Sequence, residues 1–184
     1  MILGITGTDG AGKSTVVAYL VEQKRFVHKH VRTMLLKEAD KKGLPHDRES
    51  MRLVANMLRK DNGDDFVVRR FLDEAREERL TNVIVDSVRT IAEAECLKAA
   101  GGILLAIDAD QKLRYERITG RNSESDHVTF EEFVRQEELE NNDSDPHGMQ
   151  KAAVMQMADY HLINNGSLEE LHTDIERLLH QIGV

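Results

Sequence analysis

The chain has 184 residues, enough for one domain with a sizeable core, and its composition is typical of a globular protein. Its formal net charge of -8 at pH 7 argues against non-specific binding to nucleic acid or to an anionic membrane, because the long-range field repels phosphate groups. The single cysteine, Cys96, excludes a disulfide framework and favours a reducing compartment.

The length of the apolar runs also restricts the class of protein. None approaches the roughly 18 residues of a membrane span, and the first predicted strand has no basic leader before it. We therefore expect a cytoplasmic protein without nucleic-acid or membrane partners. The sequence leaves monomer and homodimer equally open.

The first predicted strand, Ile2 to Thr6, leads directly into a phosphate-binding motif. Residues 7–14, GTDGAGKS, fit the pattern G-x-x-x-x-G-K-[ST], and a helix is predicted from Thr15 to Lys24. The glycines let successive N–H groups point at phosphate oxygens, while Lys13 reaches the β- and γ-phosphates and the Ser14 hydroxyl ligates Mg²⁺. The predicted nucleotide contacts here are Gly7, Asp9, Gly10, Ala11, Gly12, Lys13, Ser14 and Thr15.

The middle of the chain is predicted to be helical and then to return to the sheet. A charged region from His30 to Leu80 has apolar residues at helical spacing, with breaks at 43–45 and 62–63. Two apolar runs follow, Asn82 to Asp86 and Gly102 to Asp108, and both are typical of parallel strands buried on two faces. The segment Ile91 to Ala100 between them completes a βαβ unit.

The last third alternates in the same way. Helices are predicted at Gln111 to Thr119, from Thr129 onward, and at Met149 to Met157, with polar breaks at 120–127 and 141–148. A short strand, Tyr160 to Asn164, precedes a final helix from Ser167 to Ile182. Because strands and helices alternate, the predicted fold class is α/β with a mostly parallel sheet.

Ligands of open α/β sheets bind outside the carboxyl ends of the strands, so polar residues at those ends are candidate site residues. Asp86 ends a buried strand and has the position of a carboxylate that holds Mg²⁺, with a helix N-cap as the alternative. Arg89 follows closely and suits a phosphate, with a surface salt bridge as the alternative. Asn164 and Gly166, after the last strand, lie in a turn whose backbone could frame a nucleobase.

A row of arginines indicates a second group of phosphate contacts. Arg114, Arg117 and Arg121 lie at i, i+3 and i+7 and run toward the polar stretch after Thr119. The absence of an acidic partner for every member favours phosphate contact over a solvated face. The adjoining loop would be a lid that excludes water from the transferring phosphoryl group, and Arg135 on the next helix could join it.

These motifs together resemble a known family. GTDGAGKST at 7–15, DSVR at 86–89, RYERITGR at 114–121 and ADYHLINNGSLEEL at 158–171 look like the small P-loop kinases of the nucleoside monophosphate kinase and dephospho-CoA kinase group. The resemblance implies a three-layer α/β/α P-loop NTPase fold over residues 1–184, with a helical substrate-binding insertion at about 28–80 and a lid at about 119–128. It also implies transfer of the γ-phosphoryl group of Mg-ATP to a small acceptor.

The acceptor is inferred from a departure from that family. Dephospho-CoA kinases carry an aspartate shortly after the second strand, whereas the corresponding stretch here, Phe26 to Arg32, contains no carboxylate. Monophosphate kinases instead place an arginine there to bind the acceptor phosphate, and Arg32 fits that role. The predicted acceptor-binding residues are Arg32, Arg59, Arg89 and Arg135.

The sequence therefore predicts a kinase acting on a nucleotide or nucleotide-like monophosphate, with ATP and Mg²⁺ as cofactors and small-molecule nucleotides as partners. The predicted catalytic residues are Lys13, Asp86, Arg117 and Arg121, which would share the charge of the transferred group. A dephospho-CoA kinase is the alternative acceptor type. A non-catalytic nucleotide sensor or a regulatory NTPase is the alternative class, although the chain has no N-K-x-D guanine motif.

Overall fold

A computed structural model of the protein describes residues 1–120, 128–141 and 143–183. Its centre is a five-stranded sheet with the order β2-β3-β1-β4-β5, in which all neighbouring strands are parallel. The strands are β1 (Ile2–Gly7), β2 (Val27–His30), β3 (Val83–Asp86), β4 (Ile103–Asp108) and β5 (Tyr160–Ile163). The helices are α1 (Lys13–Lys24), α2 (Val31–Lys42), α3 (Arg48–Asn62), α4 (Phe66–Glu77), α5 (Ile91–Ala99), α6 (Gln111–Thr119), α7 (Phe130–Asn141), α8 (Lys151–Gln156) and α9 (Leu168–Gln181).

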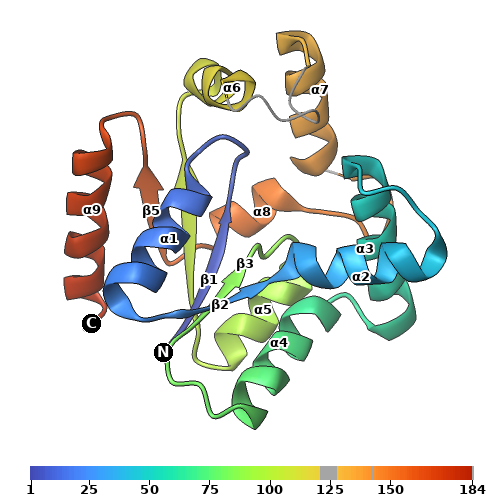
Figure 1. The fold of residues 1–184 in the computed structure, drawn as a ribbon, viewed down its shortest axis with the longest axis horizontal. Coiled ribbons are helices and arrows are strands. Elements are labelled where there is room, and N and C mark those ends of the chain that lie inside the picture. Colours follow the sequence, from blue (N-terminus) through green and yellow to red (C-terminus); the bar gives the residue numbers. More distant parts are fainter. Residues whose placement is uncertain (121–127, 142, 184) are drawn as a thin grey trace.

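Helices cover both faces of the sheet, which gives the predicted three-layer α/β/α architecture (Figure 1). On one face, α1 and α9 pack against strand residues such as Ile5 and Ile107, which are fully buried. On the other face, α4, α5 and α8 pack against Val85 and Leu104. Because both faces of β3 and β4 are covered, these strands are continuous apolar runs without alternation.

A strand that the residue pattern did not indicate overlaps the start of the predicted helical insertion at about 28–80. Residues Val27–His30 form β2, which pairs with β3 at the edge of the sheet, so the helical part of the insertion begins at Val31 and not near residue 28. The strand escaped prediction because it is short and polar, with both ends exposed. The breaks predicted at 43–45 and 62–63 are confirmed as the ends of α2 and α3.

Two helices begin with reciprocal side-chain caps. Ser167 accepts a hydrogen bond from the Glu170 amide, and the Glu170 side chain accepts one from the Ser167 amide, so α9 begins with a capping box. Thr129 and Glu132 exchange the same two hydrogen bonds just before α7. Among the described helices, none is long and apolar enough to cross a membrane.

The elements at the carboxyl ends of the strands surround the phosphate-binding motif. Figure 1 shows α6 and α7 beyond this edge of the sheet, above the loop between β1 and α1, while α2 and α3 extend from the β2 side. The predicted lid at 119–128 joins α6 to α7. Arg121 and most of that lid lie outside the described residues.

Candidate nucleotide and acceptor site

Three glycines let the motif loop pass close to neighbouring segments. A Cβ atom on Gly7 would lie 2.0 Å from the Ile107 carbonyl oxygen, and one on Gly10 would lie 2.5 Å from the Arg114 carbonyl oxygen. All three, Gly12 included, have positive φ angles, of 133°, 81° and 99° in chain order. Only glycine adopts such angles without strain and leaves room for the backbone behind it. The loop is therefore shaped by the ends of β4 and β5 and by α6.

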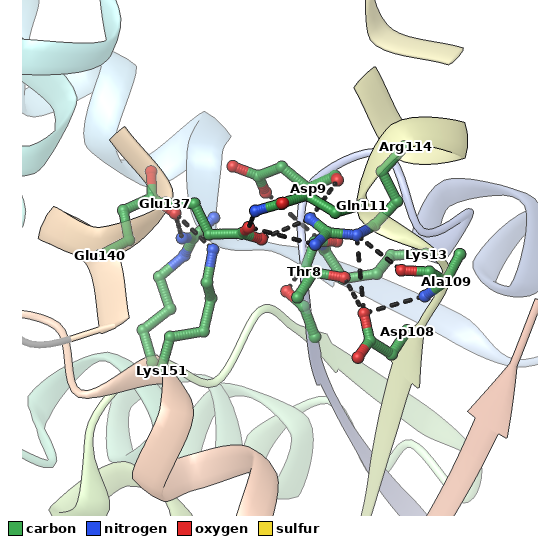
Figure 2. A network of polar contacts seen from close by, with 12 residues as sticks. Thr8, Asp9, Lys13, Asp108, Ala109, Gln111, Arg114, Glu137, Glu140 and Lys151 are labelled. Atoms are coloured by element: carbon green, nitrogen blue, oxygen red, sulfur yellow. Dashed lines mark hydrogen bonds and ion pairs between the residues drawn. The ribbon is translucent and has the colours of Figure 1, made fainter. Parts of the chain in front are cut away.

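The Lys13 ammonium contacts residues at the start of the same loop (Figure 2). Its Nζ donates to the carbonyl oxygens of Thr8 at 2.7 Å and Gly7 at 3.1 Å, and it lies 3.4 Å from Asp9 Oδ1. Burial lowers the pKa of Lys13 below its ordinary value, and the nearby Arg89 and Lys151 lower it further, while Asp9 and Asp86 oppose the shift. A bound anion would favour the charged form of this lysine.

The Asp86 carboxylate is held in its ionised form next to the loop. It accepts a hydrogen bond from the Ser87 hydroxyl, and its Oδ2 lies 3.5 Å from His28 Nε2. Burial raises the pKa of Asp86, but contacts with His28 and Ser87 and the charge of Lys13 outweigh it, so the pKa is lower than usual. The N-cap of α5 is Thr90, so the alternative role of Asp86 as a helix cap does not hold.

Ser14 and Asp86 fit a magnesium site of the kind that nucleotide phosphates complete. Both line the same cavity, one offering an exposed hydroxyl and the other an ionised carboxylate. Within the described residues, no group of three or more histidine, cysteine or acidic side chains could hold a metal by itself. Mg²⁺ suits the Ser14 and Asp86 pair, because it keeps several water ligands and takes one or two protein groups plus substrate phosphates.

One cavity of about 340 Å³ joins the motif loop to the helical insertion. Predicted residues on its wall are Asp9, Gly10, Gly12, Lys13, Ser14, Arg32, Arg59, Asp86 and Arg89. Residues of the wall that sequence reasoning missed include His30, His46, Arg52, Asn56 and Glu140. Apolar parts of the wall come from Val31, Leu35, Met51, Ala55, Ile118 and Met149. Five predicted nucleotide-binding residues of the motif and three of the four predicted acceptor-binding residues therefore line one cavity.

Arg59 is a buried residue with a fixed partner. Its side chain is 2% exposed, and its Nε and Nη2 atoms each lie 3.0 Å from Glu93 Oε1, in a side chain that is fully buried. Glu93 also accepts hydrogen bonds from the backbone amides of Arg89 and Thr90. Glu93 thus connects α3 to the loop after β3, and Arg59 reaches the cavity wall with its guanidinium already paired.

Arg52 and Asn56 precede Arg59 on the same face of α3. Arg52 Nη1 lies 3.2 Å from Asp143 Oδ2, and Asn56 Nδ2 donates to Asp145 Oδ2 at 3.0 Å. The Arg52 side chain is 36% exposed, whereas Asp143 is almost fully buried. The spacing of 52, 56 and 59 was visible in the sequence as a polar stripe and could have identified these two residues.

Arg89 and Lys151 share the carboxylate of Glu140. Lys151 Nζ lies 2.7 Å from Glu140 Oε2, and Arg89 Nη1 lies 3.4 Å from the same oxygen. Lys151 is buried behind the wall, while Arg89 is 29% exposed and lines the cavity. The salt bridge predicted as the alternative for Arg89 therefore exists, and it does not remove the side chain from the cavity.

Arg114 corrects the prediction that the arginine row lacks acidic partners. The guanidinium of this buried residue is held by both carboxylate oxygens of Glu137, and Gln111 donates to the same carboxylate at 2.9 Å (Figure 2). Arg114 Nη1 also donates to the Asp9 carbonyl oxygen at 3.3 Å. This arginine therefore connects α7 to the motif loop. Glu137 was hidden in an acidic run in which sequence pattern does not separate buried from exposed carboxylates.

The other described residues of the prediction do not line the cavity: Gly7, Ala11, Thr15, Arg117, Arg135, Asn164 and Gly166. Arg117 Nη1 donates to the Asn164 carbonyl oxygen at 2.9 Å, so it contacts the turn after β5. Asn164 is buried and points at the motif loop, whereas Gly166 is exposed. Arg135 lies on the exposed side of α7. The predicted roles of Arg117, Gly166 and Arg135 therefore stay predictions.

Known proteins resemble the chain in sequence and in fold. A family model described as an AAA domain matches residues 3–146. A UPF0200 protein of Staphylothermus marinus is 30% identical over 182 residues, which cover 98% of this chain and 92% of that protein. Another UPF0200 protein, from Methanococcus maripaludis strain C6, is 29% identical over 184 residues, covering 98% of this chain and 97% of its own.

Two solved structures share the fold at lower identity. TT1252 from Thermus thermophilus has a TM-score of 0.65 at 20% identity, covering 98% of this chain and 97% of its own. A shikimate kinase from Bacteroides thetaiotaomicron has a TM-score of 0.63 at 14% identity, covering 100% and 99%. These likenesses show the fold. The finer resemblance to the monophosphate kinase and dephospho-CoA kinase group stays a prediction.

Proposed function

Because this chain belongs to the UPF0200 family and carries an AAA domain in a P-loop fold, we propose that it is a phosphotransferase. It would move the γ-phosphoryl group of Mg-ATP to a small anionic acceptor, of which a nucleotide or nucleotide-like monophosphate is the leading class. The observation that carries the proposal is the shared cavity, in which Lys13 and Asp86 face the same space as arginines of the insertion.

The donor half would act by positioning and by neutralising charge. The motif loop offers backbone N–H groups to the phosphates, and the Lys13 ammonium would leave its carbonyl partners for phosphate oxygens. Ser14 and Asp86 would hold Mg²⁺, which would offset the charge that develops on the transferred group. Phosphoryl transfer needs little covalent work from side chains once these groups are in place.

The acceptor half is suited to an anion. Arg32 lines the cavity from α2 with an exposed side chain, Arg52 lines it from α3 with a half-buried side chain paired with Asp143, and Arg89 lines it from the loop after β3. A guanidinium binds a phosphate or carboxylate through a planar pair of N–H donors. An acceptor phosphate is already ionised, so its attack needs no general base. Leu35 and Met51 provide an apolar surface for the rest of the molecule.

Positively charged side chains near the lid would add further contacts to the phosphate groups. We place Arg117, Arg121 and Arg135 there as proposed phosphate contacts in the substrate complex. The Arg114–Glu137 contact joins α7 to the motif loop and so gives this side a fixed attachment beside the lid. By excluding water, that lid would prevent hydrolysis of ATP and so favour transfer of the phosphoryl group to the acceptor.

The test is ADP formation from Mg-ATP with a panel of acceptors. The panel contains the common nucleoside monophosphates, dephospho-CoA and shikimate, and a reaction without acceptor gives the background. We expect ADP above background with at least one nucleoside monophosphate, whose phosphate oxygen attacks, and loss of that activity in Lys13→Ala. Turnover only with dephospho-CoA, whose ribose hydroxyl attacks, would favour the dephospho-CoA kinase alternative, and turnover only with shikimate would favour a different hydroxyl acceptor. Binding of ATP without turnover on any acceptor would favour a nucleotide sensor and overturn the proposal.

A further inference from the structure

Asn164, directly after β5, points its side chain at the motif loop. The Asn164 Nδ2 atom donates a hydrogen bond of 2.8 Å to the Ala11 carbonyl oxygen, and the residue is 8% exposed. A carbonyl oxygen accepts and does not donate, so the NH₂ end of the amide must face Ala11. The contact joins residues that are 153 positions apart in the chain.

This hydrogen bond fixes the orientation of one peptide group in the loop. In a trans peptide the C=O and the following N–H point in opposite directions. Holding the Ala11 carbonyl outward against Asn164 therefore aims the Gly12 N–H inward, and Gly12 lines the cavity. The positive φ of Gly12, 99°, is part of the same arrangement, and a Cβ atom there would lie 2.4 Å from Asn164 Nδ2.

Asn164 is itself held by two other elements. Its backbone amide donates to the Asp108 carbonyl oxygen at 2.8 Å, and its carbonyl oxygen accepts from Arg117 Nη1 at 2.9 Å. Asp108 ends β4 and Arg117 lies on α6, so these two elements hold the backbone of Asn164 in place. The side-chain amide of Asn164 therefore extends from a fixed backbone. A loop peptide fixed in this way does not need to reorganise when phosphate arrives.

We infer that Asn164 is a positioning residue for the phosphate-binding loop, acting through the Ala11–Gly12 peptide and not through contact with the nucleobase. This inference rests on the proposed nucleotide-binding function and makes it more specific. A residue that touched the base would discriminate among nucleotides. A residue that aims a loop N–H acts on the phosphates alone, whatever base they carry.

The experiment compares Asn164→Asp with wild type by calorimetric titration of Mg-ATP, Mg-GTP and Mg-tripolyphosphate, which has no base. Aspartate keeps the shape of the side chain but has no NH₂ group for the Ala11 carbonyl. Asn62→Asp is the matched control, because Asn62 Nδ2 also donates to a backbone carbonyl, that of Leu58 at 2.9 Å, away from the cavity. Asn164→Ala, which removes the donor without adding charge, is measured alongside, and circular dichroism checks folding.

We expect Asn164→Asp to weaken the binding of every ligand that wild type binds, by about tenfold and by the same factor for each. Asn164→Ala should weaken binding in the same even way, and Asn62→Asp should bind as wild type does. A loss confined to ATP or GTP, with tripolyphosphate unchanged, would overturn the inference in favour of a base contact. Unchanged binding in a folded Asn164 variant would also overturn it. Failure of wild type to bind any of the three ligands would instead refute the proposed function.

Discussion

The two sides of the cavity, proposed above to hold donor and acceptor, are built by different kinds of contact. On the donor side, backbone meets backbone: Gly7 passes the Ile107 carbonyl and Gly10 passes the Arg114 carbonyl with no room for a Cβ atom. On the acceptor side, charged side chains pair across segments, as Arg59 does with Glu93 and Arg52 with Asp143. The donor side is therefore fixed by close backbone packing, whereas the acceptor side is fixed by the pairing of opposite charges.

This difference has a functional consequence. Phosphate groups are common to all nucleoside triphosphates, so a loop of backbone donors can keep one geometry for all of them. Acceptors vary, and paired side chains can be exchanged without moving the backbone. We therefore expect changes of the close-packed glycines in the donor half to affect folding and nucleotide binding together, whereas loss of an acceptor-half arginine should leave nucleotide binding unchanged.

Gly7→Ala breaks the donor half most severely. The new methyl group would lie 2.0 Å from the Ile107 carbonyl oxygen, at a residue whose φ is 133°. Overpacking and the unfavourable backbone angle together should lower the free energy of unfolding by about 4 kcal/mol. Urea denaturation followed by circular dichroism measures this change.

The control for that variant is Gly43→Ala. Gly43 also has a positive φ, 66°, but a Cβ atom there would meet nothing within 4 Å. Only the backbone cost should remain, about 1 kcal/mol. Equal losses at the two glycines would show that close packing against β4 does not shape the loop.

Glu93→Gln tests the charge balance of the acceptor half. The fully buried Glu93 carboxylate neutralises Arg59, and its loss leaves an uncompensated buried charge. We expect the free energy of unfolding to fall by about 3 kcal/mol in the same urea assay. Asp73→Asn removes the acidic partner of Arg76 in an exposed pair and should cause no measurable change. A Glu93 variant as stable as wild type would contradict the account of this half.

The elements of the proposed donor side could be predicted from the sequence because the patterns that indicate them are local. The motif at 7–14, the buried strand before Asp86 and the helix starts at Thr129 and Ser167 each depend on residues within a few positions of one another. The structure confirms these elements. The polar strand β2 was missed because its pairing with β3, and not its own composition, makes it a strand.

The proposed acceptor side could be predicted only in part, because its ion pairs join residues that are far apart in the sequence. Arg32, Arg59 and Arg89 were found as arginines in plausible places. The partners of Arg59 and Arg89 were not found: Glu93 is 34 residues from Arg59, and Glu140 is 51 residues from Arg89. A spacing rule along one helix detects charges that lie on one face, but it does not show which carboxylate comes from another element.

The most direct test of the two-part site is the binding of a non-hydrolysable ATP analogue with Mg²⁺, measured by calorimetric titration. Wild type and Arg52→Ala should bind the analogue with dissociation constants within about twofold of each other, while Lys13→Ala should bind at least about tenfold more weakly. The account would be contradicted if wild type did not bind the analogue, or if Arg52→Ala lost as much affinity as Lys13→Ala.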